Sequence, residues 1–230
     1  MIRQIQTAYG PFSVYDNDHI GQYFLNGQYY EDGMIASIIK YCGPRRRLAI
    51  DVGANYGAHS VVYAHKFQSV VAFEPQNHLF ELLEKNLEVP GTIAKCTAYN
   101  MALGHQSGQV SINQKKTSKQ ANYGGRDISL KRGGTQMRTL DSFGFDGVDL
   151  IKIDVEGAEG LVLSGARETI RKWEPILFFE FNKFKEFNQA NNVPEEFNLD
   201  ILEFLFSDCQ YRQILRLGQK NLLCIPRKQV

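Results

Sequence analysis

The hydrophobic pattern changes its period repeatedly along the chain. From about residue 48 onward, short apolar runs rich in β-branched and aromatic residues alternate with helix-length amphipathic segments. The apolar runs predict strands at 48–52, 69–73, 92–98, 148–153 and 176–181, and a final hairpin of strands 213–217 and 221–225. Apolar positions at helical spacing predict helices at 58–67, 77–88, 158–171 and 195–206. This alternation predicts an α/β fold whose mostly parallel sheet carries crossover helices on both faces.

Two regions fall outside this alternation. The first 45 residues are rich in tyrosine and phenylalanine, and predict a cap or an extra layer. Residues 104–138 are richer in glycine, glutamine, serine and lysine, and predict a strand or hairpin followed by a mobile loop. We therefore expect a single domain over residues 1–230, with a cap at 1–45, a core at 46–230 and a basic loop at 113–138.

The segment Asp51-Val52-Gly53-Ala54-Asn55-Tyr56-Gly57 joins the first predicted strand to a helix. Gly53 would let the backbone approach a ligand, and Gly57 would let the helix pack tightly on the strand. The spacing is Asp-x-Gly-x-x-x-Gly and differs from the Gly-x-Gly-x-x-Gly of dinucleotide-binding proteins. A pyrophosphate cradle is therefore not predicted, and a purely structural turn is the alternative to a ligand-binding one.

Glu74 stands at the carboxyl end of the neighbouring predicted strand. Ligands of open α/β sheets bind at these carboxyl ends, where an acid accepts hydrogen bonds from both hydroxyls of a ribose. We therefore predict that Glu74 binds a ribose. The alternative is an acid that stabilises the start of the helix after Pro75.

Four acids follow the ends of the fourth and fifth predicted strands: Asp154, Glu156, Glu159 and Glu180. Asp154 is the candidate general base, with Glu156 and Glu180 as further catalytic candidates. A carboxylate that deprotonates an alcohol needs a raised pKa or the help of a metal. Oxygen ligands suit magnesium or calcium, and Asp154 and Glu180 are the expected ligands of such a cation, although the spacing matches no strong metal motif. Glu159 is a candidate for binding the acceptor, and the alternative for Glu156 and Glu159 is stabilisation of a helix N-terminus.

Composition places the chain among folded globular proteins. With 230 residues, 43% hydrophobic and 22% charged, it is long enough to bury a core and too apolar to be disordered. Its four cysteines form no Cys-x-x-Cys pair, which predicts reduced thiols. No stretch approaches the roughly 18 apolar residues of a membrane span, and the first residues lack a signal-peptide core, so we expect a cytoplasmic protein.

The charge is balanced overall but unevenly distributed. The net charge of +1 gives no reason to expect a generally cationic nucleic-acid binder. Between residues 113 and 138, however, seven cations accompany one acid, so this segment carries +6 and the remainder −5. We predict that Lys115, Lys116 and Arg126 in this segment bind an anionic acceptor. A solvated loop kept soluble by its lysines is the alternative.

The glycine turn at 51–57 is the first of five ordered blocks. The others are Phe73-Glu74-Pro75, Ala102-Leu103-Gly104 with Gly108, Thr139-Leu140-Asp141, and Ile151-Lys152-Ile153-Asp154-Val155-Glu156-Gly157-Ala158-Glu159. Over about residues 27–182 the chain resembles the FkbM-type methyltransferases, which use S-adenosylmethionine. Tyr30-Glu31 also looks like the family's Tyr/Trp-Glu element. The resemblance implies a Rossmann-like class I sheet of seven strands that ends in a reversed pair, in agreement with the predicted hairpin.

The resemblance also assigns roles by position. Asp51, Gly53 and Asn55 would lie along the methionine portion of the cofactor, with Glu74 on the ribose. Asn100 would meet the exocyclic amine of the adenine, or form a plain turn at the strand end. The cofactor site implied in this way comprises Glu31, Asp51, Gly53, Asn55, Gly57, Glu74, Asn100 and Ala102.

We therefore expect an S-adenosylmethionine-dependent O-methyltransferase that acts on a hydroxyl of a sugar, glycoconjugate or nucleotide-linked sugar. A sulfonium methyl is already electrophilic, so the protein has to align the hydroxyl and remove its proton. One alternative is a 2′-O-methyltransferase of RNA or cap, because Lys152, Asp154, Lys183 and Glu180 supply the residue types of a Lys-Asp-Lys-Glu tetrad, although not a convincing order. Another is a catalytically silent fold that binds only a cofactor or a partner.

Overall fold

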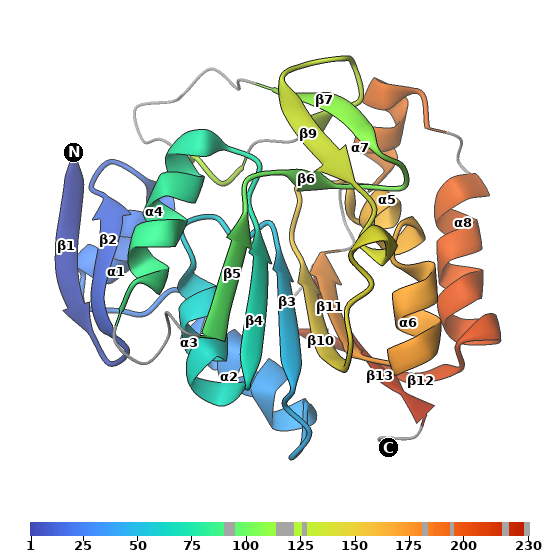
Figure 1. Ribbon diagram of the computed structural model, residues 1–230, viewed down its shortest axis with the longest axis horizontal. Helices are drawn as coiled ribbons and strands as arrows, with labels where there is room; N and C mark the ends of the chain where they lie inside the picture. Colours follow the sequence, from blue (N-terminus) through green and yellow to red (C-terminus); the bar gives the residue numbers. More distant parts are fainter. Residues whose placement is uncertain are drawn as a thin grey trace.

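The computed structural model describes residues 1–89, 95–113, 122–125, 128–180, 184–193, 196–217 and 221–227. Within these ranges, seven strands form a central sheet in the order β12-β13-β11-β10-β3-β4-β5 (Figure 1). All neighbours pair in parallel except β13, which runs antiparallel to both β11 and β12. In chain order the strands are β3 (Leu48–Val52), β4 (Ser69–Phe73), β5 (Cys96–Tyr99), β10 (Val148–Ile153), β11 (Ile176–Glu180), β12 (Tyr211–Leu217) and β13 (Asn221–Pro226).

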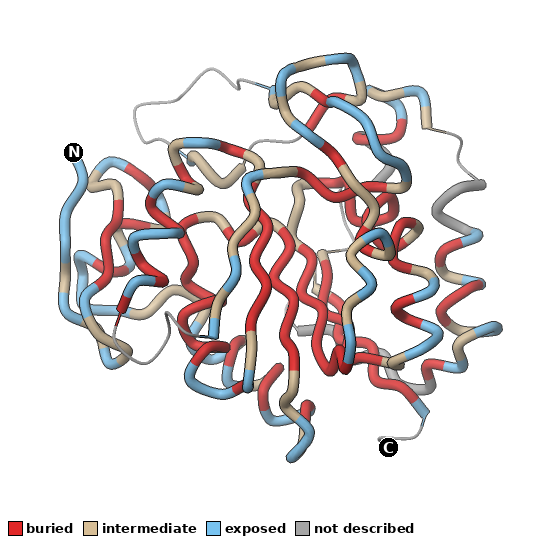
Figure 2. The backbone as a smooth tube through the Cα atoms, in the orientation of Figure 1, coloured by how far each residue is buried: buried red, intermediate tan, exposed pale blue. Residues whose placement is uncertain are grey.

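Helices cover both faces of this sheet. The helices nearest to it are α2 (Asp32–Tyr41), α3 (Ala58–Lys66), α4 (Asn77–Leu87), α5 (Glu159–Ser164), α6 (Arg167–Trp173) and α8 (Glu196–Glu203). A further helix, α7 (Phe184–Asn191), packs through Phe187 on the second sheet described below. Ile50 of β3 packs in a cluster with side chains of α5, α6 and α8, whereas its neighbour Ala49 packs with α2 and α3. Both faces of β3 are therefore buried, as Figure 2 shows for the central strands. Burial on both sides explains why the strands have continuous apolar runs.

The N-terminal segment forms an additional layer over one end of the molecule (Figure 1). Strands β1 (Ile2–Thr7) and β2 (Gly10–Tyr15) make a hairpin, followed by α1 (His19–Leu25). Phe12 and Phe24 stack with their ring centroids 4.7 Å apart, and both belong to a cluster with Tyr56 and with Leu83 of α4. This layer thus packs directly on the glycine turn that follows β3.

A second, four-stranded sheet is the main departure from the predicted organisation. It has the order β6-β9-β7-β8, with β6 (Ala102–Leu103), β7 (Gly108–Ile112), β8 (Ile128–Ser129) and β9 (Thr135–Arg138). The predicted loop at 113–138 therefore contains two strands. Buried Val110, Ile128 and Met137 pack this sheet against α5. Because its short strands contain few apolar residues, the sequence shows no recognisable strand pattern there. Residues 114–121 and 126–127, including Lys115, Lys116 and Arg126, lie outside the described residues.

Smaller departures concern element ends. The helix predicted at 158–171 is divided into α5 and α6 at Gly165, where a Cβ would lie 2.0 Å from the carbonyl oxygen of Gly104. The last predicted helix continues from α8 into a π-helical turn at Phe204–Asp208. Residues 92–94 of the third predicted strand and Gly218-Gln219 of the hairpin lie outside the described residues. In the part of the chain that the structure covers, no helix is long and apolar enough to cross a bilayer.

Gly53 fixes how close the ends of β3 and β10 approach, and this gives a first prediction. Its φ of +76° is in the left-handed region, and a Cβ would lie 1.9 Å from the carbonyl oxygen of Asp154. Gly27 has the same φ but open space around it, so it isolates the backbone cost. We expect Gly27→Ala to lower the free energy of unfolding by roughly 1–2 kcal/mol. Gly53→Ala should lose a further 1–3 kcal/mol or so from the clash.

Urea denaturation of the two variants and the wild type measures both effects. Equal losses in the two variants would show that the close approach at Gly53 does not constrain the fold.

Candidate active site

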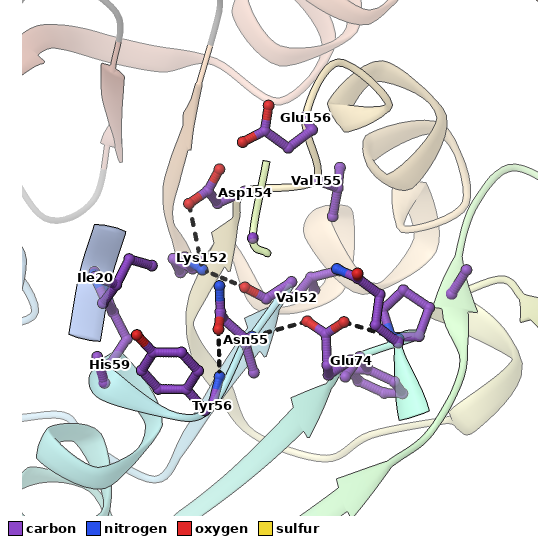
Figure 3. Close-up of a pocket in the computed structure, with 18 of the residues that line it drawn as sticks. Ile20, Val52, Asn55, Tyr56, His59, Glu74, Lys152, Asp154, Val155 and Glu156 are labelled. Atoms are coloured by element: carbon purple, nitrogen blue, oxygen red, sulfur yellow. Dashed lines mark hydrogen bonds and ion pairs between the residues drawn. The ribbon is translucent and has the colours of Figure 1, made fainter. Parts of the chain in front are cut away.

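A cavity opens at the carboxyl edge of the central sheet (Figure 3). Its walls come from the turn after β3, the end of β4, the start of β6 and the segment after β10. The start of α1, Tyr30-Glu31, Asn122, Gly124 and Ile128 enclose it further. The carboxyl ends of parallel strands are where α/β proteins bind ligands, so this cavity is the candidate active site.

An ion pair inside the sheet supports the floor of the cavity. The ammonium nitrogen Nζ of Lys152 lies 3.1 Å from Oδ1 of Asp51 and donates a hydrogen bond of 2.9 Å to the carbonyl oxygen of Gly53. Ser60 donates a 2.6 Å hydrogen bond to the other oxygen of Asp51. Burial alone would lower the pKa of Lys152, but Asp51 and Asp154 outweigh it and raise that pKa above its ordinary value. Lys152 is thus held as a cation.

Asp51 therefore has a different place from the one that the resemblance implied. Its side chain is fully buried and is not part of the cavity wall. Its contact with Lys152 makes it a support of the cavity, not a group exposed to the methionine portion of a cofactor. Gly53 and Asn55 do line the cavity, whereas Gly57 packs at the start of α3, where a Cβ would lie 2.9 Å from Leu83 of α4. The close approach at Gly57 is therefore to α4, whereas the prediction placed it between the helix and the strand.

Glu74 lies in the cavity wall at the end of β4. Its two carboxyl oxygens accept 2.9 Å hydrogen bonds from the backbone N–H groups of Asn55 and Gln76. Burial raises the pKa of Glu74 to about 7, although these two hydrogen bonds act in the opposite direction. Asn55 itself is in the left-handed region, with φ of 54°, so the glycine turn presents its N–H to Glu74. The sheet and the turn together fix this carboxyl group.

Gln76 is a cavity residue that the sequence reasoning missed. Its Nε2 donates a 3.1 Å hydrogen bond to the carbonyl oxygen of Tyr123. Its Oε1 is buried and has no hydrogen-bond partner among the described residues. A buried acceptor without a donor is costly, so this oxygen fits a ligand that supplies one. The signal in the sequence was its place two residues after Glu74, at the end of the same strand.

The residues that follow β5, where an adenine contact was predicted, differ in their relation to the cavity. Met101, Ala102 and Leu103 line the cavity. Asn100 is exposed and outside the cavity wall, and its amide donates a 2.9 Å hydrogen bond to the carbonyl oxygen of Glu74. This contact agrees with the alternative for Asn100, a turn at the strand end, because its amide is bound to the backbone.

Glu31 reaches the cavity from the N-terminal segment. Its backbone is in the left-handed region, with φ of 55°. Oε2 of Glu31 lies 2.8 Å from Nε2 of His59, and Nδ1 of His59 lies 3.0 Å from the hydroxyl of Tyr63. Burial raises the pKa of Glu31, but the contact with His59, Lys152 and the hydroxyl of Tyr30 outweighs it, so the net pKa is lowered. A carboxylate held in this way keeps its negative charge inside the cavity.

The four predicted rim acids occupy three kinds of position. Asp154, 44% exposed, and Glu156 line the cavity, and Oδ2 of Asp154 lies 3.9 Å from Nζ of Lys152. Glu180 is half-buried at the end of β11. Glu159 is 1% exposed and lies outside the cavity wall. It therefore does not offer the direct acceptor contact that was predicted for it.

Glu159 is held by the turn at the start of α5. Its Oε1 accepts backbone hydrogen bonds from Val155 at 3.1 Å and Gly157 at 3.2 Å. Burial raises the pKa of Glu159 to about 8, against the effect of these hydrogen bonds. Oxygens of Asp154, Glu159 and Glu180 all lie within 4.8 Å of one another. The structure thus gathers three of the four acids into one cluster.

The strand order, the reversed strand β13 and a cavity beside β3 and β4 define a methyltransferase-type α/β domain. The family model of the methyltransferase FkbM domain matches residues 51–213. The chain belongs to the FkbM methyltransferase family, and we treat it as a methyltransferase from here on.

Individual relatives agree with this assignment. Methyltransferase sdnD of Sordaria araneosa is 24% identical over 177 residues, which cover 57% of this chain and 68% of that protein. The crystal structure of methyltransferase FkbM from Methylobacillus flagellatus has a TM-score of 0.53 at 20% identity. The match covers 78% of this chain but only 44% of that protein. An rRNA methylase from Streptococcus thermophilus has a TM-score of 0.50 at 11% identity, and the match covers 84% of this chain and 94% of that protein. At such identities the two structures show a common fold.

The family implies S-adenosylmethionine as the methyl donor, and the cavity residues fit it. Glu74 offers a carboxyl group to vicinal hydroxyls, and the unpartnered Oε1 of Gln76 offers an acceptor to a hydroxyl or an amine. Met101 and Ala102 supply an apolar wall for a flat base. The negative charge of Glu31 suits a cationic sulfonium or ammonium group.

The raised pKa of Glu74 gives a second prediction. In the unfolded chain this group titrates near 4.5 and in the folded protein near 7, so the folded state binds the proton more tightly. Glu74 therefore lowers stability as the pH rises between these values, and glutamine does not. We expect the unfolding free energy of Glu74→Gln, relative to wild type, to rise by roughly 1–3 kcal/mol between pH 4.5 and 7.5.

Urea denaturation of the cofactor-free protein across this range measures the difference. Glu84→Gln, at an exposed position of α4, is the control for the substitution itself. A Glu74→Gln difference that does not change with pH would contradict the titration assigned to Glu74.

Proposed function

We propose that the protein is an S-adenosylmethionine-dependent O-methyltransferase acting on a hydroxyl of a sugar, a glycoconjugate or a nucleotide-linked sugar. The observation that carries this proposal is the position of Asp154. It is a half-exposed carboxylate in the cavity wall, on the segment after β10, whereas Glu74 lies in the same wall after β4. The proposed proton acceptor and the proposed ribose ligand thus line the same cavity.

The cofactor would be held mainly by groups that are already positioned. Glu74 would accept the ribose hydroxyls as a carboxylate, while its hydrogen bonds from Asn55 and Gln76 keep it in place. Met101, Ala102 and Leu103 would border the adenine. Glu31, whose side chain is 25% exposed and fixed by His59, would face the methionine portion. Each of these groups is fixed by protein contacts, which reduces the ordering needed on binding.

The transfer itself requires little from the protein besides alignment and a base. As the bond from the acceptor oxygen to the methyl carbon forms, the bond from that carbon to the sulfonium sulfur breaks, leaving neutral S-adenosylhomocysteine. The proton of the acceptor hydroxyl would pass to Asp154. Nζ of Lys152 lies 3.9 Å from Asp154. Its pairing with Asp51 keeps Lys152 protonated, so Lys152 cannot accept that proton.

An anionic acceptor is supported by the charge of the segment between residues 113 and 138. Lys131 and Arg132 are exposed, and Ile128 and Gly124 from the same region line the cavity. Lys115, Lys116 and Arg126 would add to this positive field. The acceptor would therefore carry a phosphate or carboxylate near its hydroxyl.

A 2′-O-methyltransferase of RNA is the second candidate. Lys152, Asp154 and Glu180 do meet at one edge of the sheet, and Lys183 lies outside the described residues. Lys152 is committed to Asp51 and Gly53, however, and its side chain is only 5% exposed. This leaves it little freedom to contact an RNA ribose.

A third prediction separates cofactor binding from turnover. Asp154→Asn should bind S-adenosylmethionine as tightly as wild type in calorimetry, but lose about two to four orders of magnitude in methyl transfer to the best sugar acceptor. Glu74→Ala should weaken cofactor binding itself. Near-normal turnover by Asp154→Asn would remove its role as base.

The acceptor panel decides between the candidates. It should contain free sugars, sugar phosphates, nucleotide sugars and mixed RNA, with release of S-adenosylhomocysteine as the readout. Methylation of RNA alone, with a steep salt dependence of binding, would favour the second candidate. Turnover with no member of the panel, despite cofactor binding, would favour the catalytically silent fold.

A further inference from the structure

The acid cluster at the rim arises from the parallel pairing of β10 and β11. Ile153 pairs with Phe179 in this register, so the next residues, Asp154 and Glu180, follow at the same edge of the sheet. Glu159, at the first position of α5, adds a third carboxyl group. One oxygen from each of the three residues lies within 4.8 Å of the other two.

One oxygen of this cluster is buried without a partner. Glu159 is 1% exposed, and its Oε1 is occupied by the backbone N–H groups of Val155 and Gly157. Its Oε2 has no hydrogen-bond partner among the residues that the structure describes. A buried polar atom without a partner destabilises the protein, and this one belongs to a carboxyl group that lies beside two others, so the cluster calls for a ligand.

The three carboxyl groups of the cluster also bring like charges close together. Three carboxylates at such distances repel one another and need a shared proton or a cation. Lys152 lies beside the cluster, with its Nζ 3.9 Å from Oδ2 of Asp154. Its hydrogen bond to Gly53 and its pair with Asp51 hold it on the cavity floor.

We propose that Asp154, Glu159 and Glu180 bind a divalent cation of the magnesium, manganese or calcium class. Calcium–oxygen distances of roughly 2.3–2.6 Å place opposite ligands up to about 5 Å apart, and manganese or magnesium needs only a small approach of the side chains. Such hard cations take carboxylate oxygens and complete their coordination with water or substrate oxygens. Because Asp154 also lines the cavity, a cation held by these three residues would lie beside the proposed acceptor site.

The catalytic consequence rests on the proposed O-methyl transfer. A hydroxyl bound to a divalent cation has a lowered pKa, and the cation stabilises the negative charge that develops on its oxygen. The proton still leaves to a carboxylate or to water at the rim, and the methyl group still moves from sulfur to that oxygen. Glu159 would then be a metal ligand, which explains a buried acid that makes no contact with the cavity.

Manganese alone, without cofactor, is the probe. The metal-stripped full-length chain is titrated with Mn²⁺ while the signal of free Mn²⁺ is followed by electron paramagnetic resonance, and Mg²⁺ and Ca²⁺ are tested as competitors. We expect one saturable site per chain, weakened at least about tenfold in both Glu159→Gln and Glu180→Gln. Glu168→Gln, at an exposed position of α6, should bind like wild type.

The outcomes are distinct from those of the proposed function. Because no cofactor or acceptor is present, the titration gives the same result whether or not sugars are methylated. A thermal unfolding transition shows whether Glu159→Gln is folded. If it is not, Glu180→Gln, at a half-buried position, decides the question. Absence of saturable Mn²⁺ binding in wild type, or equal binding in wild type and Glu180→Gln, would overturn the cation site and leave a shared proton as the explanation of the cluster.

Discussion

The ion pair between Lys152 and Asp51 joins the two central strands of the sheet at the point where the cavity begins. It pairs β10 with β3 through side chains whose exposed fractions are 5% and 0%, and it extends through Lys152 to the carbonyl oxygen of Gly53. Removing one member of a buried pair leaves a charge that neither water nor protein compensates. The glycine turn, the floor of the cavity and the position of Asp154 all depend on this contact.

From this pair the site divides into two halves with different electrostatics. On the β4 side, Glu74 is buried, accepts two backbone hydrogen bonds and has a raised pKa. On the β10 and β11 side, Asp154, Glu159 and Glu180 form an acidic cluster. The first half suits a neutral, hydroxyl-rich group such as a ribose, and the second suits a cation or a proton that leaves an acceptor. In the proposed methyl transfer, both halves would act at one cavity.

The sequence predicted the strands of the central sheet well because parallel strands buried on both faces leave continuous apolar runs, such as 48–52 and 148–153. It missed β8 and β9 because two- and four-residue strands carry almost no periodicity. The placement of Glu74 and Asp154 followed from their positions at strand ends. The burial of Asp51 and Glu159 did not, because a sequence shows an acid without showing whether a lysine or a turn encloses it.

A double-mutant cycle on the central ion pair tests this account most directly. The unfolding free energies of Asp51→Asn, Lys152→Met and the double variant are measured by urea denaturation against wild type. Each single variant should lose about 3–5 kcal/mol, because its buried partner is left uncompensated, and the double variant should lose clearly less than the two losses combined. Additive losses would contradict a site built on the contact between Lys152 and Asp51.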